Sequence, residues 1–121
     1  MDAALHERRR MNDDIEGTYL LVIDICSDID TYKNTERGMT ALALYEAFYK
    51  QFNRLILLTR NPLKLKKRDD VLDAADKWIK MKSVASRDDS VILSRCQEGV
   101  EVFRKYQDAL WEKGVLSLPT R

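Results

Sequence analysis

The stretch ALALYEAFYKQFNRLILLT, residues 41–59, decides the fold class of this chain. Its apolar side chains recur at steps of three and four residues, and neither Pro nor Gly interrupts them. The members of this stripe are Ala41, Leu44, Tyr45, Phe48, Phe52, Leu55, Ile56 and Thr59. Such spacing places them on one face of a helix about five turns long, and that face needs a partner to bury it.

Other segments carry the same helical periodicity. Ile15, Tyr19, Val22, Cys26 and Ile29 alternate steps of four and three residues, which is the seam of a packed helix. We expect helices over about residues 13–32, 36–60, 69–82 and 89–113, with residues 1–12 as an extension or a short helix.

The expected helix ends follow from local residue types. Asn34 or Thr35 is expected to cap the second helix, because a short polar side chain accepts a hydrogen bond from the first free N–H groups. Asn61-Pro62 is expected to end that helix near Arg60. Gly114 is a natural stop for the fourth helix.

Periodicity also separates two fold classes. Residues 19–26, 55–59 and 91–93 are short apolar runs that suit buried strands, and they would give an α/β chain with a small parallel sheet. The stripe of the second helix, however, passes through residues 55–59 without a change of phase. The chain has 121 residues with only four Gly and two Pro, which favours long helices joined by short links. We predict one all-α domain over residues 1–121, an antiparallel up-down-up-down four-helix bundle, with α/β as the alternative.

The composition of the chain limits the cellular compartment and the classes of partner that we expect. With 45% hydrophobic and 34% charged residues the chain is globular, and its net charge of +1 neither favours nor excludes nucleic acid. Cys26 and Cys96 lie among apolar residues, which predicts buried free thiols in a reducing cytoplasm. No run approaches the roughly 18 apolar residues of a membrane span, and residues 1–10 lack the apolar core of a secretory signal. We therefore expect a cytoplasmic protein without a membrane partner.

Residues for catalysis and metal binding are scarce. His6 is the only histidine, and with two distant cysteines it cannot complete a Cys/His zinc site. No Glu precedes His6 by three residues, as a di-iron motif requires, and a Ser-His-Asp triad would need His6 as its base. No Gly-rich phosphate loop is present. We expect no catalytic residue, no metal site and no cofactor.

Two acidic pairs, Asp73 with Asp76 and Glu98 with Glu101, lie on the third and fourth helical segments. Carboxylate pairs on facing helices can hold Mg²⁺. The pattern resembles the all-α, MazG-type nucleoside triphosphate pyrophosphatases, whose metal sites use Glu-x-x-Glu and Glu-x-x-Asp pairs on neighbouring helices. The resemblance covers four residues, with Asp in place of both Glu of the first pair, and implies a Mg-dependent nucleotide hydrolase. Helical projection turns both pairs toward solvent, so the hydrolase is our second alternative.

A basic segment leads to the first alternative, a nucleic-acid-associated accessory protein. Its members are Arg54, Arg60, Lys64, Lys66, Lys67 and Arg68. Such a cluster contacts phosphates, and the resulting binding depends strongly on salt. A cation near the end of a helix also complements the helix dipole, and a linker must stay solvated. Nucleic acid is therefore not the favoured partner.

Apolar residues off the main stripes lead to the favoured hypothesis. These residues are Leu20, Leu21, Ile25, Leu42, Leu57 and Leu58. A helix that is apolar on more than one face is buried on more than one side. In a four-helix domain the surplus indicates a second contact surface. We expect a non-catalytic interaction or assembly module that forms a homo-oligomer or joins a protein partner.

Overall fold

The computed structural model describes residues 2–32, 40–64, 70–81 and 88–116. Its helices are α1 (Asp2–Asp30), α2 (Ala41–Lys64), α3 (Asp70–Lys80) and α4 (Asp89–Glu112). No strand occurs in the part of the chain that the structure describes. The predicted all-α class is confirmed, and the α/β alternative is wrong there because residues 19–26, 55–59 and 91–93 are helical.

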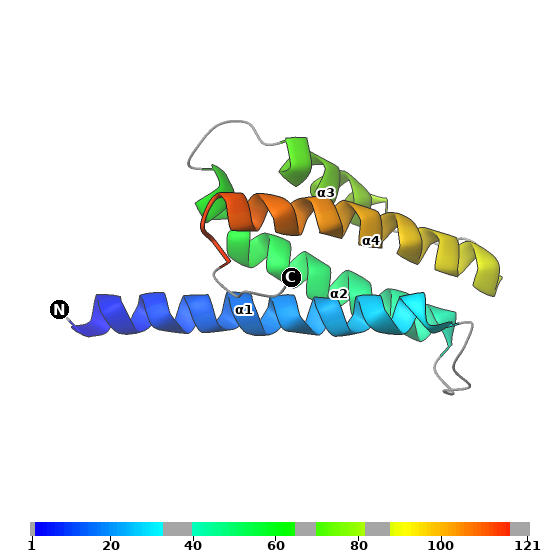
Figure 1. The fold of residues 1–121 in the computed structure, drawn as a ribbon, viewed down its shortest axis with the longest axis horizontal. Coiled ribbons are helices and arrows are strands. Elements are labelled where there is room, and N and C mark those ends of the chain that lie inside the picture. Colours follow the sequence, from blue (N-terminus) through cyan, green and yellow to red (C-terminus); the bar gives the residue numbers. More distant parts are fainter. Residues whose placement is uncertain (1, 33–39, 65–69, 82–87, 117–121) are drawn as a thin grey trace.

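Successive helices run in opposite directions, as their colours show in Figure 1. α1 lies along α2, and α2 also contacts both α3 and α4. α3 packs against α4, whereas α1 meets α4 over a smaller contact. The first turns of α1 extend past the ends of the other helices (Figure 1). The arrangement is the predicted up-down-up-down bundle, with α2 at its centre.

The stripe of residues 41–59 forms the middle of the core, and each of its members is at most 6% exposed. Phe48 and Phe52 from this stripe meet Phe103 of α4 edge-on, with ring centres 6.4 and 5.6 Å apart. Trp78 of α3 completes the cluster, 5.3 Å from the Phe48 ring. Such pairs contribute about 0.5–1.5 kcal/mol each beyond the burial of their area. Aromatic packing therefore joins α2, α3 and α4.

The bounds of α2 differ from those expected at both ends. α2 begins at Ala41, because the Thr40 hydroxyl accepts a hydrogen bond from the Ala43 N–H at 3.1 Å and caps the helix. The expected caps, Asn34 and Thr35, lie outside the described residues. α2 also continues through Pro62 to Lys64. A proline in a helix removes one backbone hydrogen bond, yet α2 continues past that loss instead of ending near Arg60 as expected.

The other helices differ from expectation mainly at the N-terminus. α1 includes residues 2–12 in one continuous helix, so that segment is an extension of α1. α3 and α4 end within two residues of the expected positions, which is the ordinary uncertainty of a helix end. Gly114 has a φ of +72°, and the Val115 N–H donates to the Leu110 carbonyl at 2.8 Å. Gly114 thus ends α4 as predicted.

Candidate interaction surface

Arg95 of α4 holds the C-terminal end of α3. Its Nη2 atom donates to the carbonyls of Trp78 and Met81 at 2.7 and 2.8 Å. The carbonyls at the end of a helix need partners from outside the helix, and here the guanidinium supplies them. The same guanidinium lies 4.7 Å from the centre of the Trp78 ring, a cation–π distance. One largely buried arginine side chain therefore fixes α3 on α4.

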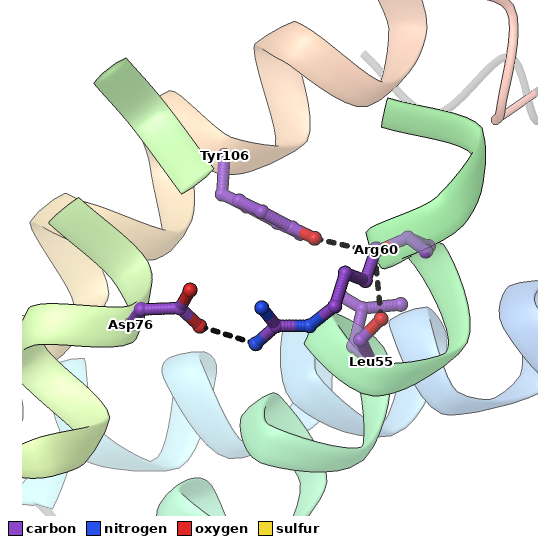
Figure 2. A network of polar contacts seen from close by, with 5 residues as sticks. Leu55, Arg60, Asp76 and Tyr106 are labelled. Atoms are coloured by element: carbon purple, nitrogen blue, oxygen red, sulfur yellow. Dashed lines mark hydrogen bonds and ion pairs between the residues drawn. The ribbon is translucent and has the colours of Figure 1, made fainter. Parts of the chain in front are cut away.

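A second set of polar contacts ties α2 to α3 and α4 (Figure 2). Nη2 of Arg60 donates to Oδ1 of Asp76 at 2.7 Å, which links α2 to α3. The buried hydroxyl of Thr59 donates to the Leu55 carbonyl at 2.7 Å and shares a hydrogen bond with the hydroxyl of Tyr106. Buried hydroxyls need such partners, since an unpaired one costs about 1–3 kcal/mol. The ion pair thus positions α3 on α2, and the hydrogen bond between the two hydroxyls positions α4 on α2.

A groove of about 450 Å³ runs between α3 and α4, and we call it the α3/α4 groove. Its lining consists of Val71, Ala74, Glu98, Glu101, Val102 and Lys105. Three of these side chains are apolar, and the three charged ones all come from α4. Glu98, Glu101 and Lys105 are exposed. The three apolar side chains, which we call the apolar floor of the groove, come from α3 and α4, and charges of both signs lie on its α4 side, which we call its charged wall.

A second groove, about 400 Å³, lies between α1 and α4. Arg104 of α4 lies 3.4 Å from Asp30 of α1 at this groove, and the ion pair joins its two walls. Cys26 lines the groove, and burial raises the pKa of its thiol to about 12, with Asp30 adding to the rise. Because the thiolate is the nucleophile, this thiol is unreactive near neutral pH.

The two cysteines are buried free thiols, as predicted. Burial also raises the pKa of Cys96, to about 11. Both shifts disfavour the thiolate in the folded protein, so the unfolded chain loses its thiol protons first as pH rises. The thiols therefore contribute their full stability below pH 9, and this contribution falls as pH rises above that value.

The acidic pairs do not come together as a metal site. Asp73, Glu98 and Glu101 are exposed, and Asp76 is drawn to Arg60. Across the described ranges, no three His, Cys, Asp or Glu side chains are grouped so that they could hold a metal ion. Helical projection therefore placed three of the four carboxylates correctly, and it missed the partner that α2 supplies to the fourth.

The structure describes the side chains of only part of the predicted basic segment. Arg54 is exposed, and Arg60 is engaged with Asp76. Lys64 is the last residue of α2, but its side chain lies outside the description, as do Lys66, Lys67 and Arg68. Of the predicted cations, only Arg54 and Arg60 have described side chains, and Arg60 is paired with Asp76.

The six apolar residues of the predicted interface divide into two groups by their exposure. Leu20, Leu21, Leu42 and Leu57 are 44%, 49%, 47% and 62% exposed. Ile25 and Leu58 pack partly buried against the core. Leu20 and Leu21 are neighbours and project about 100° apart, while Leu42 and Leu57 are separated by about 22 Å along α2. Leu42 and Leu57 therefore do not share one compact patch on α2.

Sequence reasoning missed the α3/α4 groove and two further exposed apolar residues, Met81 and Val91. The sequence did contain one sign of this groove, because Val102 is an apolar residue off the α4 stripe and lies between Glu98 and Lys105, which carry opposite charges.

None of the described helices is long and apolar enough to cross a membrane. Comparison of the chain with protein-family models, with curated proteins and with solved structures finds no significant match.

Proposed function

We propose that this chain is a non-catalytic helical module that works by association, either with itself or as a small subunit of a complex. The observation that carries the proposal is the α3/α4 groove, because its apolar floor is open and its charged wall suits a protein surface. The contacts of Arg95 and Arg60 keep both walls in place, so a partner would meet a preformed site.

Exposed apolar side chains add support. Leu20, Leu21, Leu42 and Leu57 remain about half exposed in the single chain. Scattered exposed leucines are common on protein surfaces, so they count for less than the groove. We place the module in the cytoplasm, because two buried free thiols suit a reducing compartment.

The two alternatives have weaker support. Pairing of Arg60 with Asp76 removes one cation from the basic set and one carboxylate from the acidic set. A nucleic-acid partner would then depend on Arg54 and on the residues that follow α2. A hydrolase would depend on Asp73, Glu98 and Glu101, which the described structure does not group.

Sedimentation equilibrium of the full chain tests the proposal. We expect the weight-average mass to rise from 14.1 kDa toward twice that value as the concentration increases from low micromolar to near millimolar. Constant monomer mass over the whole range, together with no stoichiometric partner recovered by a tagged chain, would contradict it. Salt-sensitive binding of an oligonucleotide by the same sample would favour the first alternative instead.

A further inference from the structure

The charges of the α3/α4 groove are arranged in a pattern that complements itself. Glu98 and Lys105 are exposed and seven residues apart on α4, so they lie on the same side of the helix about 10 Å from each other. Val102 lies between them and forms part of the apolar floor. Glu98 also lies 3.4 Å from Arg95 of the same helix.

Two such helices fit together when they run antiparallel. A twofold axis near Val102 brings Glu98 of each copy opposite Lys105 of the other, which gives two equivalent ion pairs. A twofold contact requires this property, that residue i meets residue j and j meets i. Glu101 lies closer to the axis, and Lys105 one turn further along its own helix offsets the approach of the two Glu101 carboxylates.

The apolar floor suits the same arrangement. Val71, Ala74 and Val102 of each copy would form one apolar centre beneath the ion pairs. Ala74 is small, which lets a second helix approach closely. A basic partner helix would meet Lys105, and an acidic one would meet Glu98 and Glu101. A second copy of this chain carries both an acidic and a basic side chain at the matching positions, so it can place an opposite charge beside Glu98 and beside Lys105.

We infer that the α3/α4 groove is the contact surface for a second copy of this chain, in a twofold dimer held by reciprocal Glu98–Lys105 ion pairs around Val102. This inference rests on the proposed function and names its partner. The groove between α1 and α4 is less suited to this role, since the ion pair of Asp30 with Arg104 joins its two walls.

A charge-swap series measured by sedimentation velocity tests the inference. Glu98→Lys alone and Lys105→Glu alone each turn two attractive contacts into repulsive ones, and we expect the dimer dissociation constant to rise about tenfold or more. The double variant Glu98→Lys/Lys105→Glu restores opposite charges in reversed order at the two inferred pairs, so its dissociation constant should fall below that of either single variant. Glu46→Lys on α2 is the matched control and should change little.

The outcomes separate the inference from the proposed function. Loss of the dimer in both single variants and its recovery in the double variant support the inference. A dimer that is indifferent to all three variants overturns it while leaving self-association intact. A chain that is monomeric throughout overturns both the inference and self-association. Circular dichroism of each variant confirms that these exposed substitutions leave the helices formed.

Discussion

Replacement of Trp78 by Ala is expected to lower the free energy of unfolding by about 3–5 kcal/mol, a range typical of a buried aromatic side chain. Trp78 is 4% exposed, and its ring contacts four aromatic rings of α2. α3 has only 11 residues, and a helix this short is marginal in water without packing. Loss of the indole therefore removes the main apolar anchor of α3.

Urea denaturation followed by far-ultraviolet circular dichroism measures this effect. Leu57→Ala is the matched control, because Leu57 is 62% exposed and its truncation should change stability by less than about 0.5 kcal/mol. A loss below about 1 kcal/mol for Trp78→Ala would contradict the described core, since so small a value is typical of surface positions.

Replacement of Gly99 by Ala is expected to destabilise the protein by about 1–3 kcal/mol, the usual effect of overpacking a core. An added Cβ at Gly99 would lie 2.5 Å from Cζ2 of Trp78 and 2.6 Å from Cε2 of Phe48. Both atoms belong to buried rings that have little room to move. The better helix propensity of Ala returns up to about 1 kcal/mol, which is not enough to reverse the sign.

Gly17→Ala provides a control with the opposite sign. Gly17 lies inside α1, and an added Cβ there meets nothing within 4 Å. The better helix propensity of Ala is then the only effect, and we expect the free energy of unfolding to rise by about 0.5–1 kcal/mol. In the double variant Gly99→Ala/Trp78→Ala the two losses should be less than additive, because the indole ring that the added methyl group would touch is absent. Equal stabilisation by both Gly→Ala changes would contradict the contact between α3 and α4.

The core was predictable because its signal is local. The period of residues 41–59 fixes which face of α2 is buried, and the same reasoning holds for Ile15, Tyr19 and Val22 of α1. Helix ends were less predictable, since several polar residues compete for each cap. Thr40 caps α2 although Asn34 and Thr35 are equally suitable by residue type.

The candidate surface was less predictable, because it depends on which helices become neighbours. Val71 and Ala74 join Val102 in a groove only when α3 packs beside α4. A helical projection turns Asp76 toward solvent, but Arg60 of α2 reaches it. Exposure of Leu57 and partial burial of Leu58 were likewise decided by neighbouring helices, since both lie off the same stripe.

Thiol cross-linking tests the central claim most directly, because it asks which surface two copies share. The native thiols interfere little, since burial raises the pKa of Cys26 to about 12 and that of Cys96 to about 11. Glu101→Cys places a thiol near the inferred twofold axis, and Glu46→Cys places one at an exposed position of α2 away from the groove. A short bismaleimide should link Glu101→Cys chains into covalent dimers and leave Glu46→Cys chains monomeric. Cross-linking of Glu46→Cys chains alone, or of neither variant, would contradict the claim.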